Sequence, residues 1–235
     1  MSDEEEDEDE LEELDKVFSW SGAIVDFVPI GMGIASYVNG DTFEGVYLDG
    51  KRNGLGRYIF KNGATYEGNY SQNQKSGMGT MNYPDKSIYQ GSWFQDKRHG
   101  EGQYTYPNGD IYKGQWKDNK RDGVGTYHFQ NPISQFVGDW LKGGFTKGTW
   151  LFANGDIYEG IFAKNKPNGQ GKFMFFKSKG TAQGKFEKSR WIIGNTSMTP
   201  AKIILQYMLK ASPSIFASSN NPLNQPSSVI PMRFL

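Results

Sequence analysis

Residues 89–111 read YQGSWFQDKRHGEGQYTYPNGDI, and this stretch contains the pattern that decides the fold. Residues 88–93 alternate between polar and apolar or small side chains, as a half-buried strand does. Residues 95–99 are polar and predict a hairpin loop, after which residues 100–106 alternate again. Residues 107–110 then predict a tight turn, because Asn-Gly favours the positive φ angles of a type I′ turn. The stretch therefore predicts two antiparallel strands and a turn into the next unit.

The same pattern recurs about every 23 residues along the chain. Its period is marked by the glycine of each aromatic-x-Gly-x-aromatic match: Gly22, Gly45, Gly68, Gly91, Gly114, Gly138, Gly160 and Gly184. A Gly-x-Gly pair begins nine residues after most of these glycines. Self-similarity at a fixed period is typical of repeat architectures, in which each unit packs on its neighbours. The sequence thus predicts one continuous antiparallel meander.

Composition supports an all-β fold without a conventional aliphatic core. The chain has 235 residues, of which 30 are Gly, 16 Phe, 13 Tyr and 6 Trp. Tyr89, Gly91 and Trp93 are two residues apart and share one face of their strand. We expect aromatic rings to lie over glycines of the neighbouring unit, because a strand glycine marks a close approach. The expected fold is an elongated single-layer antiparallel sheet of about sixteen strands, spaced about 4.8 Å apart.

Charge divides the chain into unequal parts. Lys and Arg number 26 and Asp and Glu number 26, but eleven of the acids lie within residues 3–15. A dense block of like charge repels itself, so residues 1–17 are predicted to form an acidic disordered segment. The remainder carries a positive excess. We predict that residues 18–187 form the array, with about seven units and a partial eighth, and that residues 188–235 form a C-terminal segment.

The C-terminal segment contains a predicted helix over about residues 200–211. Thr199-Pro200 resembles a helix start, and four apolar residues follow at helical spacing: Ile203, Ile204, Tyr207 and Met208. A helix this short is marginal alone, so we expect it to dock on the array end or on a partner. The following tail is rich in Ser, Pro and Asn. Residues 229–235 are apolar again, and we hypothesise that they form a docking peptide.

Residue types argue against catalysis. The chain has no Cys and only two His, His99 and His128, neither with a nucleophile partner at a suitable spacing. Asp41, Asp110 and Asp156 recur at the same turn position, which favours turn capping over metal binding. The Gly-x-Gly pairs precede no helix, as a phosphate-binding loop would require. We expect no enzymatic activity, no catalytic residues, no metal and no cofactor.

Targeting signals are also missing from the sequence. It begins with acidic residues and not with a basic and then apolar leader, and it contains no apolar run of membrane-spanning length. We therefore expect a soluble intracellular protein.

Units such as YKGQWKDNKRDGVGTY, residues 112–127, resemble MORN repeats, named for membrane occupation and recognition nexus. The resemblance covers about residues 20–187 and implies a run of hairpins in one elongated sheet. Some proteins of this family are linked to membranes, whereas others carry an enzyme domain after the array. Only about 48 residues follow residue 187 here, so we expect no such enzyme domain.

The whole layout is similar to the MORN proteins of ciliary radial spoke heads. An acidic start precedes the array, the array fills nearly the whole chain, and an irregular late unit around residues 136–149 precedes NKPNGQGKF at residues 165–173. This resemblance implies a structural role in the ciliary or flagellar axoneme. The implied partners are other radial spoke head and stalk proteins, with functional contact to the central apparatus, in cytoplasm and cytoskeleton.

The aromatic face is the predicted protein-binding surface, since a large exposed apolar patch usually marks a partner site and Tyr and Trp are common at interfaces. The alternative is that the rings only pack on one another. With the apolar residues of the predicted helix, the candidate residues are Tyr66, Tyr89, Trp93, Tyr112, Trp116, Trp140, Tyr158, Ile203, Ile204, Tyr207 and Met208.

A row of basic loop residues offers a second hypothesis. Three Lys-Arg pairs recur at equivalent positions: Lys51-Arg52, Lys97-Arg98 and Lys120-Arg121. They could bind anionic lipid headgroups, which would make the protein a peripheral membrane tether. No lipidation motif or amphipathic anchor strengthens that hypothesis, so membrane binding is the secondary expectation. Acidic residues also stand close to the basic residues, and nucleic-acid binding is not expected.

Overall fold

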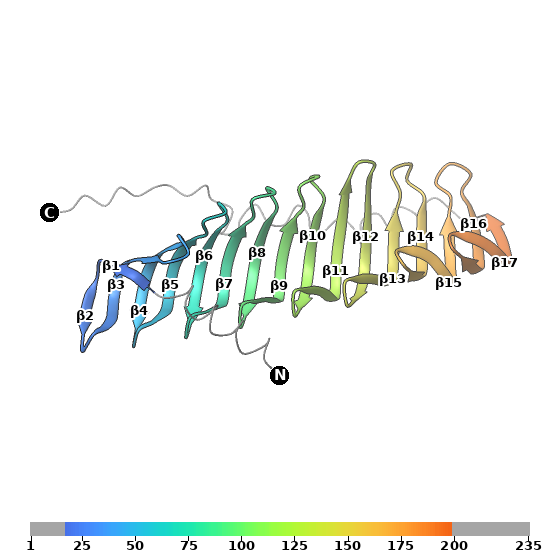
Figure 1. The fold of residues 1–235 in the computed structure, drawn as a ribbon. Helices are drawn as coiled ribbons and strands as arrows, with labels where there is room; N and C mark the ends of the chain where they lie inside the picture. The colour runs from blue at the N-terminus through green and yellow to red at the C-terminus, as the bar shows by residue number, and fades with distance from the viewer. Residues whose placement is uncertain (1–16, 199–235) are drawn as a thin grey trace, which may run out of the picture.

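The computed structural model describes residues 17–198, which form one antiparallel sheet of seventeen strands (Figure 1). The strands are β1 (Val17–Trp20), β2 (Ala23–Val25), β3 (Val28–Tyr37), β4 (Thr42–Leu48), β5 (Lys51–Ile59), β6 (Thr65–Ser71), β7 (Gln74–Asn82), β8 (Ile88–Phe94), β9 (Lys97–Thr105), β10 (Ile111–Lys117), β11 (Lys120–Gln130), β12 (Ile133–Leu141), β13 (Gly144–Leu151), β14 (Ile157–Ala163), β15 (Lys166–Met174), β16 (Gly180–Glu187) and β17 (Arg190–Met198). The acidic segment up to residue 16 and the helix predicted over about residues 200–211 lie outside the described residues.

From β3 to β17 every strand pairs with the next one along the chain, whereas β1 and β2 both pair with β3. Glycine faces glycine at successive joints: Gly91 pairs with Gly102, and Gly102 with Gly114. This confirms an all-β single sheet of consecutive hairpins. The sheet has one strand more than expected, because β17 continues it beyond residue 187.

Two kinds of turn alternate along the array. The turn between β8 and β9 consists of Gln95 and Asp96, which both have positive φ, 48° and 63°. This is the type I′ signature, and the strand resumes at Lys97, so the predicted loop over residues 95–99 was too long. At Asn108-Gly109 only the glycine has positive φ, and Gly109 N–H donates to Tyr106 O. The prediction of a type I′ turn at the Asn-Gly pairs was therefore wrong.

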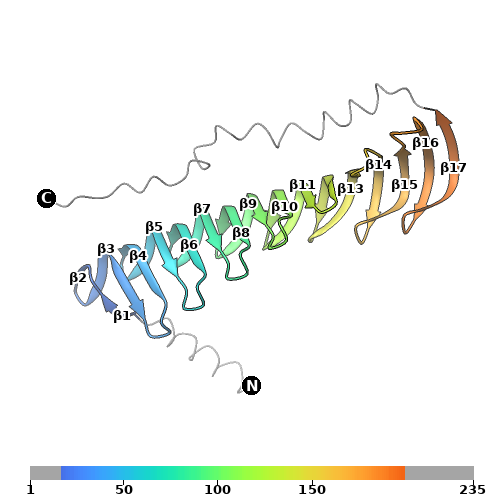
Figure 2. The same ribbon diagram turned by 90° about the horizontal axis from the view of Figure 1, so that it is seen from above.

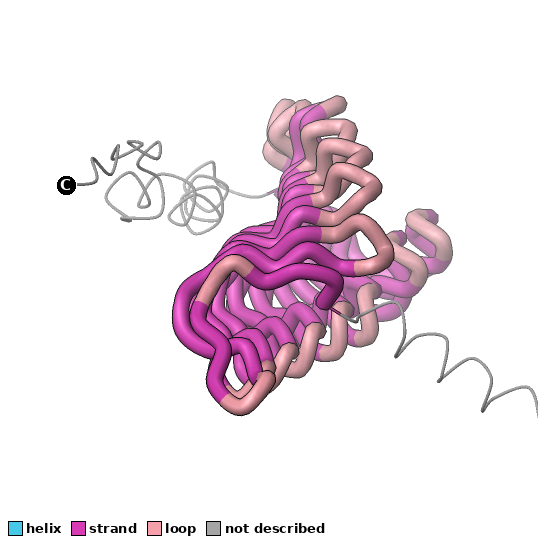
Figure 3. Tube along the Cα trace, turned by 60° about the vertical axis from the view of Figure 1, so that its left-hand side comes forward, coloured by secondary structure: helices cyan, strands magenta, loops and turns pink. Residues whose placement is uncertain are grey.

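The strands are bent, so the sheet is not flat. Figure 2 shows the hairpins following one another along a long, gently curved axis. Viewed obliquely toward the N-terminal end, both rows of turns project to the same side of the bent strands (Figure 3). Register shifts in most hairpins, such as the one between Gly91 and Trp93, are β-bulges, which bend a strand and increase its twist. Bending turns one face of the single layer into a concave surface that can enclose side chains.

The rings fill the glycine gaps of their own hairpin. A Cβ atom on Gly102 would lie 2.6 Å from Tyr89 Cζ, and one on Gly171 would lie 2.5 Å from Tyr158 Cζ. In each case tyrosine and glycine belong to the two strands of one hairpin. The expectation that the neighbouring unit supplies this ring was therefore wrong, because the aromatic side chain leans across its own strand pair.

Candidate protein-binding face

A spine of buried rings runs along the concave face. Its members are the predicted residues that the structure describes, with relative exposures of 0% for Tyr66, Tyr89, Tyr112 and Tyr158, 6% for Trp93, 5% for Trp116 and 3% for Trp140. Burial raises the pKa of Tyr158 to about 12 and raises the pKa of Tyr89 further. The structure therefore shows these rings packed on one another. A binding partner would first contact the more exposed side chains that surround them.

Edge-to-face contacts link the units. The ring of Tyr89 lies 5.1 Å from that of Trp93 in its own strand and 5.3 Å from that of Trp116 in the next unit. The interplanar angles are 90° and 83°, which is the T-shaped arrangement that aromatic quadrupoles favour. Tyr112 repeats both contacts with Trp116 and Trp140 at 5.2 Å. Each tyrosine thus joins its own tryptophan to the following one.

The indole groups also hydrogen-bond backward along the array. Trp93 Nε1 donates to Gly79 O at 3.2 Å, Trp116 Nε1 to Gly102 O at 3.1 Å and Trp140 Nε1 to Gly125 O at 3.2 Å. A buried indole N–H needs an acceptor. The acceptor in every case is the carbonyl of the glycine over which the preceding tyrosine lies. The tryptophan therefore fixes the spacing between consecutive hairpins.

A row of cations covers the rings at the turn edge between β4 and β11. Arg52, Lys75, Arg98 and Arg121 occupy one repeat position. The guanidinium of Arg98 lies 4.7 Å from the ring of Trp116, and that of Arg121 lies 4.3 Å from the ring of Trp140. These distances are within the range of cation–π attraction. We call these four residues the cation row.

Asparagine side chains of the following unit hold two members of the cation row. Arg98 N–H donates to Asn119 Oδ1 at 2.9 Å, and Arg98 Nη2 donates to Asn119 O at 3.0 Å. Arg52 makes the equivalent bonds to Asn73 at 2.8 and 3.1 Å. Asn119 is the second residue of its type I′ turn, with φ 65°. The cation row therefore contributes to the joint between units as well as to the surface.

A second set of contacts joins the units at the opposite turn edge. Asp110 accepts hydrogen bonds from Asn108 Nδ2, Tyr127 Oη and the backbone N–H of Gln130 at 3.0, 2.8 and 2.8 Å. Asp41 makes the same contacts with Asn39, Tyr58 and Lys61. The prediction of turn capping is confirmed and extended, since each carboxylate also binds the next unit. We call this arrangement the aspartate clasp.

Hydrogen bonds favour the ionised form of the Asp110 carboxylate. Burial by itself would raise the pKa of Asp110, but the hydrogen bonds from Gln130, Tyr127 and Asn108 outweigh it and lower that pKa below its ordinary value. Each donor binds the carboxylate form. The clasp at Asp110 is therefore a stabilising contact whose strength depends on pH.

A half-buried aromatic stripe lies beside the clasps and forms the accessible part of the inner face. It consists of the rings that end the second strand of each hairpin and begin the turn: Phe60, Tyr83, Tyr104, Tyr106, Tyr127, Phe129, Trp150, Phe152 and Phe173. Neighbouring rings are close, with centroids 4.6 Å apart for Tyr104 and Tyr106 and 5.4 Å for Tyr106 and Tyr127. We call this set the rim stripe. The site prediction omitted it, although the aromatic-x-aromatic endings of these strands signal it.

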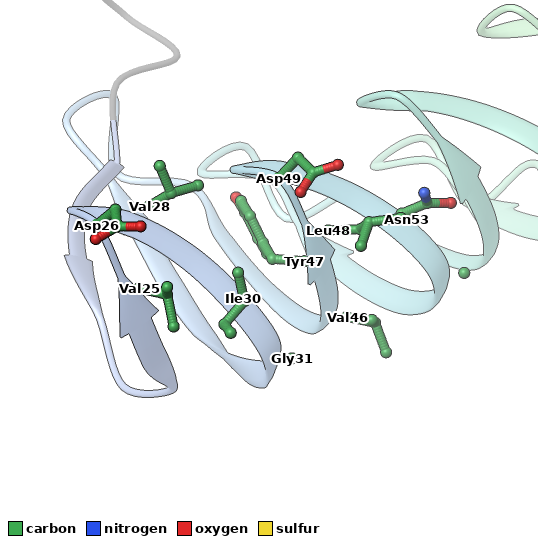
Figure 4. Close-up of a pocket in the computed structure, with 11 residues that line it drawn as sticks. Val25, Asp26, Val28, Ile30, Gly31, Val46, Tyr47, Leu48, Asp49 and Asn53 are labelled. Carbon is green, nitrogen blue, oxygen red and sulfur yellow. The ribbon is translucent and has the colours of Figure 1, made fainter.

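A shallow groove lies at the N-terminal end of the sheet (Figure 4). Val25, Val28, Ile30, Val46 and Leu48 give it apolar walls, with Asp26, Asp49 and Asn53 at its margin. The carboxylates come from separate turns, and within residues 17–198 no three His, Asp or Glu side chains lie close enough to hold a metal ion. The groove provides an apolar surface and no set of converging catalytic groups.

Half of the predicted basic loop row points inward. Lys51, Lys97 and Lys120 are exposed, whereas their neighbours Arg52, Arg98 and Arg121 are partly buried in the cation row. His128 is half-buried on the other face of β11, where burial and then Lys113 lower its pKa. Ile203, Ile204, Tyr207 and Met208 lie outside the described residues.

A family model described as MORN repeat matches residues 43–65, 66–88, 89–111, 112–131 and 158–177. These five segments are similar to MORN repeats. Every match begins at the residue whose ring fills the glycine gaps of its own hairpin, from Phe43 to Tyr158. The unmatched interval between residues 131 and 158 falls on β12 and β13, where Thr146 stands in place of a glycine.

No curated protein sequence matches the chain. Among solved structures, the TCP domain of SAS-4 (dCPAP) of Drosophila melanogaster, in complex with a proline-rich motif of Ana2 (dSTIL), is similar at 19% identity. The alignment covers 62% of this chain and 79% of that one, with a TM-score of 0.38. The TCP10 domain of Danio rerio CPAP is similar at 12% identity, over 66% and 84% of the chains, with a TM-score of 0.36. These values are too low for a functional comparison.

Within residues 17–198 there is no helix with the length and hydropathy needed to span a bilayer.

Proposed function

We propose that this protein is a non-enzymatic structural scaffold that holds other proteins along its MORN array. The observation that carries this proposal is the continuity of the ring spine, which joins successive hairpins through repeated Tyr–Trp contacts and Trp–Gly hydrogen bonds. Stability in such an array is the sum of units and their nearest-neighbour joints. A long, uniformly joined sheet can present the same edge to several partners at fixed intervals.

The partner surface that the geometry favours is the rim stripe. Its rings are partly accessible, and aromatic side chains are common anchors of protein interfaces. The buried spine beneath it holds each ring in place, which reduces the entropy lost on binding. We propose that the rim stripe binds apolar side chains of partner subunits.

The assembly that we propose is the radial spoke head of cilia and flagella, in which the chain would take the place of a subunit like radial spoke head protein 1. Support comes from the sequence layout: an acidic start, an array filling most of the chain, and the irregular late unit. There it would contact other spoke-head and stalk proteins, and its localisation would be the axoneme. Enzymatic activity forms no part of this proposal.

Affinity purification of the tagged chain from motile ciliated cells tests the assembly. Axonemes are first stripped of membrane with detergent, and co-purifying proteins are identified after a moderate salt wash. Recovery of spoke-head and stalk proteins is the expected result. Recovery with the detergent-soluble fraction and without axonemal proteins would contradict it.

A pair of variants tests the rim stripe itself. Phe175 extends the stripe by one exposed ring, since it stacks on Phe173 with centroids 5.0 Å apart and is 38% exposed. Phe175→Ser should release the co-purifying subunits. Phe94→Ser removes an equally large ring, 56% exposed, beside the other row of turns and should leave them bound. Equal loss in both variants would mean that the stripe has no special role.

The second candidate is a peripheral tether for anionic lipids. The exposed Lys51, Lys97 and Lys120 favour it, since each basic residue near an anionic surface contributes about 1 kcal/mol. Flotation with vesicles containing phosphatidylserine tests it. If the tether hypothesis holds, the chain floats with the vesicles, and replacing the three lysines by glutamine abolishes flotation.

A further inference from the structure

The two ends of the described sheet are open strand edges of opposite kind. Within residues 17–198, β17 pairs only with β16, and β1 and β2 pair only with β3 (Figure 1). Strand β17 is a second strand of its hairpin, and β1 with β2 forms the equivalent of a first strand. At every inner joint, a second strand pairs with the first strand of the next unit, as β9 does with β10. The open side of β17 is therefore the natural complement of the open side of β1 and β2.

Apolar side chains remain uncovered at the β17 end. Trp191 is 44% exposed, Ile192 55% and Ile193 70%. Trp191 pairs with Phe186, as Phe145 pairs with Trp140 two units earlier, yet Phe145 is only 1% exposed. The difference arises because Phe162 of the next unit covers Phe145 at 4.6 Å. Trp191 lacks such a unit within the described residues, so the end resembles an inner joint with one half removed.

The same two ends of the sheet also differ in charge. Residues 142–190 carry ten Lys and Arg against three Asp and Glu, an excess of +7, whereas residues 17–141 carry twelve of each. The eleven acids of residues 3–15 precede β1 directly. The acidic end of the sequence is thus attached to one edge of the sheet, and the basic surface lies at the other.

The acidic segment is too short to reach most of the basic surface of its own chain. Fourteen residue-to-residue steps lead from Val17 to Asp3, which gives a fully extended reach of about 50 Å. Strand β1 lies one step from β3, and ten further steps lead to β13, where the basic region begins. At about 4.8 Å a step that distance is about 53 Å, and β17 lies about 20 Å beyond it. The basic surface therefore fits the acidic segment of another molecule.

We propose that the chain associates head to tail with a second copy of itself. The β1–β2 edge of one copy adds to β17 of the other, and residues 3–15 of the first copy lie on the basic β13–β17 region of the second. In this arrangement β13 is five steps from the incoming β1, about 24 Å, which residues 3–15 span easily. The contact is heterologous, so it can propagate into a chain of copies. This inference does not depend on the identity of other partners.

The repeat register predicts which residues meet. Glycines face each other at inner joints, as in Gly79 with Gly91 and Gly148 with Gly160. The same register places Gly194 of one copy opposite Gly22 of the other, and therefore Ile193 opposite Ala23. Both are exposed, and directly opposed strand residues have Cα atoms about 4.5–5.5 Å apart, which suits a disulfide.

Because the chain has no cysteine, disulfide trapping tests the register cleanly. The full-length double variant Ala23→Cys with Ile193→Cys is oxidised at low ionic strength and examined on a non-reducing gel. A ladder of linked copies is the expected result. Leu55→Cys with Ile193→Cys is the matched control, because Leu55 is 66% exposed but lies in mid-array, and it should give no ladder.

Single variants exclude the symmetric alternative. Ile193→Cys alone should remain monomeric under oxidation, since a dimer linked through it would mean that two β17 edges pair with each other. Absence of a ladder in the double variant, with sedimentation showing only monomer at all concentrations, would overturn the proposal. Circular dichroism confirms that each variant keeps its sheet.

The contribution of charge to the association is tested by replacing the eleven acidic residues of residues 3–15 with their amides. Head-to-tail affinity measured by sedimentation should fall about tenfold or more, as several exposed ion pairs are lost. High ionic strength should likewise lower the head-to-tail affinity of the unmodified chain. If the unmodified chain stays monomeric and removal of residues 199–235 alone permits association, then those residues occupy β17, and the proposal fails for the full chain.

Discussion

In β4–β11 a cation covers the rings of every unit, whereas in β12–β17 apolar side chains occupy the same repeat position. Arg98 lies over Trp116 in the first region, and Phe145 packs on Trp140 and Phe162 in the second. The pairing of glycine with glycine does not change, since Gly102 pairs with Gly114 and Gly148 with Gly160. The comparison indicates that glycine positions specify the sheet, while the filling of the concave face is variable.

A finer comparison concerns the aspartate clasp. Asp41, Asp110 and Asp156 occur where the next turn offers a backbone N–H, from Lys61, Gln130 and Phe176. At two of the other equivalent positions, occupied by Ala64 and Ser87, the next turn has Pro84 and Pro107, which have no N–H to donate. A buried carboxylate there would lose one of its donors, so a small or neutral residue is the better solution.

The largest expected effect tests whether the two regions share the glycine requirement. Gly102→Ala and Gly171→Ala should each lower the free energy of unfolding by about 3 kcal/mol or more, because the new Cβ would overlap a fully buried ring that cannot move. Denaturant unfolding followed by circular dichroism measures this. Gly144→Ala is the control, since its nearest neighbour is Leu141 O at 3.6 Å. A tolerated Gly171→Ala would show that the second region is built differently.

The second-largest effect concerns the cation row, which is present in β4–β11 and absent from β12–β17. Arg98→Met should cost about 2 kcal/mol of unfolding free energy, because it removes a partly buried cation–π contact and the guanidinium hydrogen bonds to Asn119. Lys97→Met, at the exposed neighbouring position, should change stability by about 0.5 kcal/mol or less. Hydrogen exchange of β9 and β10 locates the loss. Equal effects of the two substitutions would remove the structural role assigned to the cation row.

Acid stability should depend on the clasp. The pKa of Asp110 is lowered in the fold, so its stabilising contribution is complete above the ordinary pKa of about 4 and is lost as pH falls through the lowered value. Asp110→Asn should cost about 1–2 kcal/mol at neutral pH and flatten the acid limb of the stability curve. Urea unfolding at a series of pH values measures both. An unchanged acid limb would mean that Asp110 titrates alike in folded and unfolded chains.

The smallest effect is expected when a clasp is transferred into one of the units that lack it, at Ala64. Ala64→Asp alone should destabilise the fold, since Met81 and Pro84 offer no donors. Adding Met81→Tyr and Pro84→Lys should recover the loss and leave a net gain of about 1 kcal/mol or less. Thermal unfolding of the single and triple variants is compared with that of the original chain. If the triple variant remains as unstable as the single one, the proline explanation is wrong.

The sequence by itself determined the repeat, the strand count to within one, and the face shared by rings and glycines. These follow from a period of 23 residues and from the two-residue alternation of strands. It also located the turn-capping aspartates. It did not place the turn types correctly, because positive φ at Gln95 and Asp96 is imposed by the tight hairpin and not by Asn-Gly propensity.

Only the tertiary structure decided which faces are accessible. A flat sheet would expose Tyr89 and Trp116, but bulges bend the strands until neighbouring units bury both rings. The inward turn of Arg98 and the exposure of Trp191 likewise depend on whether a following unit is present. Burial is a property of neighbours in space, and a repeat pattern records only the distance between neighbours along the chain.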